Sequence, residues 1–389
     1  MRSLKAPIGA ALRNARIALP ARRGPAARAT APLAVAGFFT TASGIGEAAR
    51  RSADALEGLG LAPVRLDISE ALNQRDLAGA PIAALPAGRT GALLLHANAP
   101  ETAPALLAAG MTRGRGWRVI GCWNWELEAP PPDWPRAQRF LTEVFASSHF
   151  TAAALAPHLS IPVRVAPIPV AAPARIEAPA PVEAQRAHGD FLCVVFADGR
   201  SSLARKNPAA AIRAFRLAFG DRPGRRLIVK TRNLAGSAQA DDLRAAADGS
   251  AAIRFFDGTI TEAERWALIK AADAVISLHR SEGFGLTLAE AMAIGKPTIA
   301  TAWSANLDFM TEENSLLVPC TLVPVKDPGG PYEGLPGRWA EPDTGAAAAM
   351  LRQLAEHPAR AREIGEKART TIARTLTPEA HAAAFLKGR

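Results

Sequence analysis

The chain has 389 residues, of which 49% are hydrophobic and 21% charged, a composition typical of a globular protein with two domains of ordinary size. Its three cysteines are scattered and no run is long and apolar enough to span a bilayer, which argues against a disulfide framework and a transmembrane helix. Seven of the ten net positive charges lie in the first 46 residues, so the rest of the chain is nearly neutral and a nucleic-acid partner is not indicated.

Residues 1–32 are predicted to form a basic extension. We interpret it as flexible, and two alternatives stay open: a surface helix that contacts anionic lipid, and an organelle transit peptide. The extension has no apolar core segment, so it is not a secretory signal. We expect the protein to lie in the cytoplasm. Peripheral contact of this extension with the inner face of a membrane is a further hypothesis.

Residues 33–170 are predicted to form an N-terminal domain in which strands alternate with helices. Short apolar runs predict strands at 33–39, 62–69, 91–100, 116–125 and 162–170, and helices are expected at 47–60 and 142–155. The stretch that follows, 171–189, is rich in proline and alanine and lacks apolar periodicity. We interpret it as a hinge between domains.

The same pattern restarts in residues 190–372, the predicted C-terminal domain. Strands are expected at 191–197, 226–231, 253–258, 274–279 and 295–302, and helices at 207–220, 261–273 and 286–295. Thr261 and Glu264 have the spacing of a capping box. Residues 373–389 are expected to form a last helix, which we place against the N-terminal domain as a hypothesis. The fold class is therefore α/β, with two Rossmann-like parallel sheets that face each other across a deep cleft.

The stretch SEGFGLTLAE, residues 281–290, combines two acids with glycines at the start of a helix. It follows the strand 274–279, so it lies at the carboxyl edge of the sheet, where backbone amides and a helix N-terminus suit a phosphate group. Glu282 in the loop and Glu290 on the helix suit hydroxyl groups at the two ends of a nucleoside-diphosphate sugar. The alternative is that both acids are ordinary solvated side chains.

The longer segment SLHRSEGFGLTLAEAMAIGKPTIAT closely resembles the donor site of retaining GT-B glycosyltransferases of family 4, in which two glutamates are separated by seven residues. The resemblance extends over roughly residues 35–345 and is looser in the first domain. It implies that Glu282 contacts the transferred sugar and that Glu290 binds ribose hydroxyls. It also implies that three backbone amides donate to the sugar and phosphate: those of Gly283, Phe284 and Gly285.

A basic loop follows the first strand of the second domain, in DGRSSLARKNP. Guanidinium and ammonium groups there suit a diphosphate leaving group, and ordinary surface charge is the alternative. The run RKNP resembles the phosphate-binding segment of the same family, which favours Arg205 and Lys206. Arg200 is a third candidate.

Gly44 and Gly46 lie between the first strand and its helix, where they resemble the family's glycine-rich loop over the diphosphate or the acceptor. A plain tight turn is the alternative. A dinucleotide-binding fingerprint is incomplete here, because Ala49 stands at the third glycine position. Asp67 is close enough to the expected acid to keep that interpretation open.

Polar and aromatic residues follow two further strands of the first domain. His96 ends a strand at a place where the family often has a histidine near the reacting sugar carbon, although a lone histidine is more often structural. Asn98 follows it. Trp123 and Trp125 suit the faces of sugar rings, with core packing as the alternative, and Glu126 belongs to a WNWEL segment similar to one in bacterial polysaccharide glycosyltransferases of this family. We assign four of these residues to the acceptor side: Asn98, Trp123, Trp125 and Glu126.

Asp308 lies in SANLDFM, which resembles the family's loop near the donor, although Ala305 stands where a glycine is common. The segment PGRWAEPD, residues 336–343, resembles the same bacterial subgroup, and no role follows for it.

The resemblance implies a hexosyltransferase that moves a sugar from a nucleoside diphosphate to a hydroxyl of a glycan or lipid-linked acceptor with retention, in bacterial polysaccharide or glycoconjugate synthesis. No cofactor is expected, and cationic side chains in place of a metal ion predict metal independence. The competing hypotheses are a non-catalytic protein that binds sugar nucleotides or glycans on this scaffold, a sugar-nucleotide epimerase, a phosphorylase with pyridoxal phosphate, and a dinucleotide oxidoreductase. The nucleobase, the sugar, the acceptor and the oligomeric state do not follow from the sequence.

Overall fold

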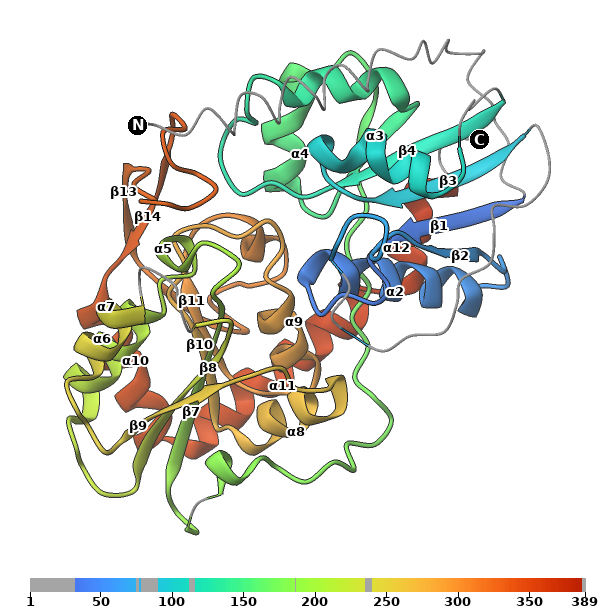
Figure 1. Cartoon of the computed structure of the whole chain (residues 1–389). Helices are drawn as coiled ribbons and strands as arrows, with labels where there is room; N and C mark the ends of the chain where they lie inside the picture. Colours follow the sequence, from blue (N-terminus) through green and yellow to red (C-terminus); the bar gives the residue numbers. More distant parts are fainter. Residues whose placement is uncertain are drawn as a thin grey trace.

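The computed structural model describes residues 32–74, 77, 90–111, 116–185, 187–234 and 240–386. The basic extension expected at 1–32 therefore lies outside the described residues, apart from Pro32. The described chain forms two α/β lobes, each built around one six-stranded parallel sheet (Figure 1).

The first sheet has the strand order β2-β1-β3-β4-β5-β6, with every neighbouring pair parallel. Its strands are β1 (Leu33–Gly37), β2 (Val64–Asp67), β3 (Gly91–His96), β4 (Trp117–Trp123), β5 (Glu143–Ala146) and β6 (Val163–Val165). All residues of β1, β3 and β4 are buried, because helices cover both faces of the sheet. For the same reason these runs are mostly apolar, with Arg118 of β4 and His96 of β3 as buried exceptions.

The helices of this lobe are α2 (Gly44–Gly58), α3 (Ala99–Ala108) and α4 (His149–Leu155), with 3-10 turns η1 (Trp134–Phe140) and η2 (Ala156–His158). The helix expected at 142–155 was wrong in its first half, because Glu143–Ala146 is the strand β5. Ser148 then caps α4 by accepting a hydrogen bond from the Thr151 amide. A short apolar run does not distinguish a buried strand from a helix by its periodicity.

The second sheet has the order β12-β11-β10-β7-β8-β9, again parallel throughout. Its strands are β7 (Phe191–Asp198), β8 (Arg225–Arg232), β9 (Ile253–Asp257), β10 (Ala274–Ser277), β11 (Thr298–Thr301) and β12 (Leu316–Val318). Its helices are α5 (Leu203–Lys206), α6 (Pro208–Phe219), α7 (Ala240–Ala247), α8 (Glu262–Ala271), α9 (Leu286–Ala293) and α10 (Thr344–Glu356), with a 3-10 turn η4 (Ala305–Asp308). The capping box of Thr261 and Glu264 is present at the start of α8. The prediction of two parallel α/β sheets is confirmed.

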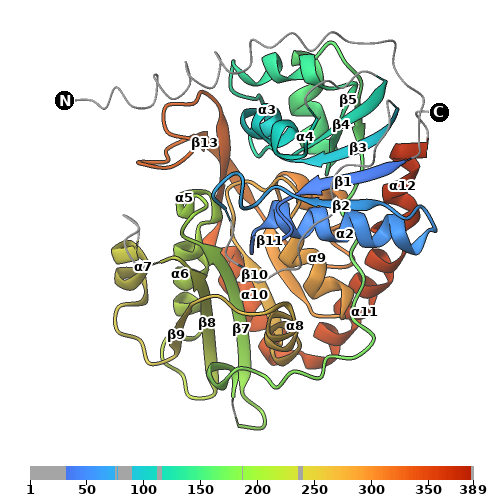
Figure 2. The ribbon, with the colours of Figure 1, turned by 45° about the vertical axis from the view of Figure 1, so that its right-hand side comes forward.

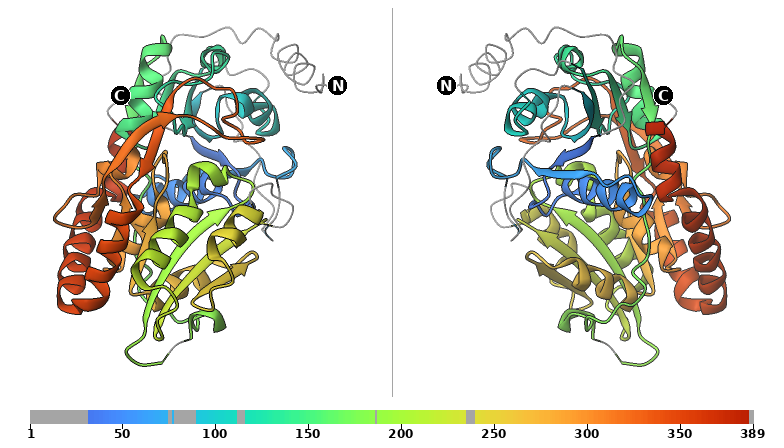
Figure 3. Two further views of the ribbon diagram at one scale, coloured as in Figure 1. Left: turned by 90° about the vertical axis from the view of Figure 1, so that its left-hand side faces the viewer. Right: turned by 90° about the vertical axis from the view of Figure 1, so that its right-hand side faces the viewer.

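Three further segments join the lobes (Figures 1 and 2). A chain with the 3-10 turn η3 (Val182–Ala184) runs from the first sheet to β7. An antiparallel hairpin of β13 (Cys320–Pro324) and β14 (Arg338–Pro342) extends from the second lobe to the first (Figure 3, left), and the sequence did not predict it. The helix α11 (Pro358–Thr375) packs along α9, and α12 (Pro378–Leu386) follows it.

Helix α12 packs on the first lobe, although it comes last in the chain (Figure 2). Arg118 of β4 donates to the Phe385 carbonyl oxygen over 2.8 Å, and the Phe385 side chain is fully buried. His381 and Ser52 of α2 form a hydrogen bond of 2.8 Å. In the part of the chain that the structure describes, no helix has the length and apolar character needed to cross a bilayer.

Candidate active site

The two acids of the SEGFGLTLAE corner are both buried at the carboxyl edge of the second sheet. Glu282 is 7% exposed in the loop after β10, and Glu290 is 1% exposed on α9. Gly285, with φ of 93°, precedes the first residue of α9 in a backbone conformation that favours glycine. Because burying a charge is costly unless it is paired, each carboxylate needs cationic partners.

Glu282 finds these partners in the basic loop after β7. The Lys206 ammonium contacts one carboxylate oxygen, and Arg205 Nη1 lies 3.4 Å from the other. The Glu282 amide donates to Ser304 Oγ over 2.8 Å. Burial by itself would raise the pKa of Glu282, but Lys206 and Arg205 lower it to about 2, so the group is ionised at neutral pH.

Arg205 is the most enclosed cation of this group, with 4% of its surface exposed. Its guanidinium donates to the Ser281 carbonyl oxygen over 2.7 Å and to Ser201 Oγ over 3.0 Å. Among the residues that the structure describes, its Nε has no hydrogen-bond partner. The short helix α5 that carries it is capped by Ser202, whose hydroxyl accepts from the Arg205 amide over 2.9 Å. Arg200, the third basic candidate, is exposed earlier in the same loop.

Glu290 is engaged by two arginines from different lobes. Arg51 Nη2 of α2 lies 2.5 Å from Glu290 Oε1, and Arg265 Nη2 of α8 lies 2.9 Å from it. The same two arginines pair with Glu47 of α2, over 2.7 and 3.3 Å. Burial raises the pKa of Glu290 more than Arg265 and Arg51 lower it. The carboxylate that we predict to bind ribose is therefore occupied here by the protein's own cations.

The glycine-rich loop lies at the carboxyl end of β1. A Cβ atom at Gly46 would stand 2.5 Å from the Phe38 carbonyl oxygen and 2.6 Å from that of Thr41, so this position requires glycine. Gly44 has open space around it. Asp67 accepts from the Thr40 hydroxyl over 2.6 Å and from other groups of the same lobe. Its carboxylate thus holds the loop after β1 to the end of β2.

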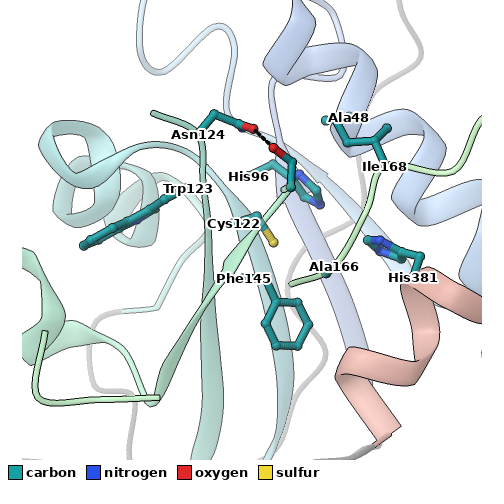
Figure 4. A pocket seen from close by; sticks show the side chains of 10 residues that line it. Ala48, His96, Cys122, Trp123, Asn124, Phe145, Ala166, Ile168 and His381 are labelled. Atoms are coloured by element: carbon teal, nitrogen blue, oxygen red, sulfur yellow. Dashed lines mark hydrogen bonds between the residues drawn. The ribbon is translucent and has the colours of Figure 1, made fainter. Parts of the chain in front are cut away.

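His96 lines a pocket in the first lobe, to which His381 of α12 also contributes (Figure 4). Its side chain is buried, and both ring nitrogens lack a hydrogen-bond partner among the described residues. Burial, with His381 as a second cause, lowers the pKa of His96 to about 3, so the ring is neutral at neutral pH. One nitrogen then donates and the other accepts, which suits a hydroxyl group.

The pocket is lined by Ala48, His96, Cys122, Trp123, Asn124, Phe145, Ser147, Ala166, Ile168 and His381. The Ser147 hydroxyl bonds to Asn124 Oδ1 over 2.7 Å and donates to the Gly283 carbonyl oxygen over 3.0 Å. The pocket therefore lies directly beside the loop of Glu282.

The acceptor-side candidates are packed together in this conformation. Trp123 is fully buried, with an edge contact to Trp134 at 5.8 Å, and Trp125 packs on Trp134 at 4.7 Å. Both rings belong to the core and present no open face. Asn98 Oδ1 accepts from the Asn124 amide over 2.8 Å. The Glu126 carboxylate accepts from the Tyr332 hydroxyl over 2.7 Å.

Asp308 lies on η4 of the second lobe, where it contacts His149 of the first lobe. It accepts from the His149 amide over 2.8 Å and lies 3.2 Å from the same residue's ring nitrogen, at the start of α4. In the described ranges, no three His, Cys, Asp or Glu residues are grouped as a metal site.

Sequence reasoning missed three residues that contact the predicted site: Arg51, Arg265 and Tyr332. Arg51 is 239 positions from Glu290 and Arg265 lies on the helix before β10, so neither belongs to the segment that carries the two acids. Tyr332 carried one signal, because it is the single tyrosine of the chain and precedes the unassigned segment 336–343.

Residues 199–323 match the protein family described as "Glycosyl transferases group 1". Among solved structures, a glycosyltransferase from Rickettsia africae ESF-5 superposes with a TM-score of 0.60 and 14% identity, over 91% of this chain and 96% of that chain. HepE of Anabaena, in complex with UDP and glucose, superposes with a TM-score of 0.59 and 12% identity, over 91% of this chain and 98% of its own.

TarM of S. aureus, in complex with fondaparinux, alpha-GlcNAc-glycerol and UDP, has a TM-score of 0.55 and 12% identity over 77% of this chain. The chain spans only 56% of the length of TarM. No curated protein sequence matches the chain significantly. The fold is GT-B, with the two six-stranded sheets as its Rossmann-like domains. The family match over residues 199–323 supports a glycosyltransferase.

Proposed function

We propose that the protein is a retaining glycosyltransferase of family 4 type, which moves a hexosyl group from a nucleoside-diphosphate sugar to a hydroxyl of a glycan or lipid-linked acceptor. The observation that carries the proposal is the cluster of buried Glu282 and Arg205 with half-buried Lys206, because it lies at the carboxyl edge of the sheet and inside the family match. Two cations held against one ionised carboxylate are preorganised for an anionic ligand.

In this proposal Arg205 and Lys206 stabilise the departing diphosphate, and the amides of the 283–285 loop donate to it. Glu282 stays ionised and orients the sugar. The bond between the sugar C1 and the phosphate oxygen breaks while the acceptor oxygen bonds to C1 on the same face. The acceptor proton passes to the departing phosphate oxygen, so no protein nucleophile is needed.

His96 is assigned to a hydroxyl of the transferred sugar, since its neutral ring offers one donor and one acceptor beside the Glu282 loop. Glu290 is assigned to the ribose, which requires that Arg51 releases it. The remaining acceptor-side, glycine-loop and Asp308 assignments are kept as proposals. So are the absence of a cofactor, metal independence, a role in bacterial polysaccharide synthesis, and a cytoplasmic location with peripheral membrane contact.

UDP is the nucleotide that we expect, because HepE and TarM were solved with it. The test is thermal unfolding with UDP, GDP and ADP for the wild type and for Glu290→Ala. A nucleotide at 100 times its dissociation constant stabilises a protein by about 2.7 kcal/mol. A shift with one nucleotide in the wild type and a smaller shift in the variant supports the donor site. No shift with any of the three at millimolar concentration contradicts the proposed function.

A further inference from the structure

The hairpin of β13 and β14 places Tyr332 against the donor site. Its connecting loop begins at residue 325, just beyond the family match, which ends at residue 323. Tyr332 is 5% exposed and packs on Trp125 of the first lobe at 5.5 Å and on Trp339 of the hairpin at 6.4 Å. The hairpin therefore contacts the first lobe through the buried ring of Tyr332.

Tyr332 contacts both members of a charged pair. Its hydroxyl donates to Glu126 Oε2 over 2.7 Å, and its ring centre lies 5.8 Å from the Arg205 guanidinium. Glu126 Oε1 stands 3.9 Å from Arg205 Nη2, so this pair is loose. Burial raises the pKa of Tyr332 well above its ordinary value, so the hydroxyl keeps its proton and acts as a donor.

Asp327 of the hairpin's connecting loop joins Tyr332 to the same basic loop. Asp327, which is 3% exposed, accepts from Ser202 Oγ over 2.7 Å and from the Tyr332 amide over 3.1 Å. Ser202 is the residue that caps the short helix of Arg205. The position of the tyrosine is therefore tied to the position of the guanidinium through buried hydrogen bonds.

We propose that Tyr332 is a positioning residue of the donor site. It holds Glu126 away from Arg205 and so keeps the guanidinium able to bind the diphosphate. Arg205 lies between two carboxylates, Glu126 and Glu282. A guanidinium closely paired with both has little attraction left for a diphosphate. By donating to Glu126, Tyr332 holds that carboxylate at 3.9 Å from Arg205. The proposal rests on the proposed function, because it assigns Arg205 to the diphosphate.

The test measures affinity for UDP, GDP, ADP and inorganic pyrophosphate by calorimetry in the full chain. Tyr332→Phe keeps the ring and removes the hydroxyl, so Glu126 is free to close on Arg205. We expect diphosphate binding to weaken about tenfold. Adding Glu126→Gln to this variant removes the competing charge and is expected to restore the wild-type affinity, while Glu126→Gln by itself does not weaken binding.

A structural role gives a different result, because loss of packing is not repaired by neutralising Glu126. Val325→Ala in the same hairpin is the matched control: it removes apolar contact with the hydrophobic cluster that includes Tyr332 and Trp339, and is expected to lower the melting temperature with unchanged affinity. Equal affinity in Tyr332→Phe and wild type, or weakened binding that Glu126→Gln does not restore, overturns the role of Tyr332 and leaves the proposed function standing. A wild type that binds none of the four ligands overturns both.

Discussion

Arg51 of the first lobe and Glu290 of the second form an ion pair across the junction, with 2.5 Å between Nη2 and Oε1. Glu290 is 1% exposed, so no hydroxyl of a ligand reaches it in this conformation. The cluster of Glu47, Arg51, Arg265 and Glu290 holds the lobes together where the nucleoside of a donor is expected to bind.

Replacing Arg51 is therefore expected to tighten nucleotide binding. In Arg51→Gln, Glu290 keeps Arg265, and Glu47 keeps Arg265 and Arg50, so neither acid is left unpaired. Removing a competitor for Glu290 raises the binding-competent fraction, and we expect affinity for UDP to rise by about three- to tenfold by calorimetry.

The control for this variant is Arg65→Gln, which removes the same charge from a pair with Asp54 and Glu57 in the same lobe. It is expected to leave the affinity unchanged. Weaker UDP binding by Arg51→Gln contradicts the competition between Arg51 and the nucleotide for Glu290. Arg51 is then assigned to binding the nucleotide directly.

Glu282→Gln is expected to separate turnover from binding. The substitution preserves the shape of the side chain and removes the ionised group between Lys206 and Arg205. Sugar transfer is expected to fall by about 10²-fold, the effect of losing one preorganised electrostatic contact. Affinity for the nucleoside diphosphate is expected to hold or rise, because both cations lose a competing carboxylate.

Two quantities are measured: kcat for sugar transfer, once the donor sugar has been identified, and the dissociation constant of the nucleoside diphosphate of that donor. Glu366→Gln, an exposed acid of α11 that pairs with Arg369, is the control. Unchanged kcat in Glu282→Gln removes this glutamate from the reaction.

Stability is expected to fall as the pH drops from about 6.5. The folded-state pKa of His96 is about 3 and that of His381 about 4, each below the ordinary value of 6.5, chiefly because burial disfavours the charged ring. The unfolded chain therefore binds more protons in this range, and the free energy of unfolding decreases between pH 6.5 and about 3. Glu282 and Glu47, both with a pKa of about 2, add a loss in the same direction below pH 4.5.

Thermal unfolding between pH 7.5 and 4.5 measures this slope. His96→Asn removes one buried titrating ring and is expected to flatten it, whereas His149→Asn, whose side chain is 80% exposed, is not. The same slope in all three proteins contradicts the assignment to His96.

Phe385→Ala is expected to destabilise the protein by about 3–5 kcal/mol, the cost of a large cavity in a packed core. The ring is fully buried, and the Arg118 guanidinium lies 5.0 Å from its centre. The neighbouring Leu386 is 37% exposed, so Leu386→Ala is expected to change stability by less than about 0.5 kcal/mol. Denaturant unfolding compares the two, and similar costs contradict the docking of α12.

The sequence by itself determined the fold class and much of the local architecture. Apolar runs of four to eight residues predict strands, and the capping box of Thr261 and Glu264 marks the start of α8, because these signals depend on neighbours in the chain. The strand–loop–helix corner of Glu282 was predictable for the same reason. Its burial and its partners were not, so its role stays a prediction.

Only the tertiary structure decided which groups meet. Arg51 and Glu290 are 239 positions apart, and Glu126 and Tyr332 are 206 apart. Such contacts depend on the order of the strands and on the docking of one lobe against the other, which no local periodicity records. The state of the site follows from these contacts. Glu290 is paired with Arg51 because the lobes are docked, and Arg205 is enclosed where the hairpin's Tyr332 packs on Trp125 of the first lobe.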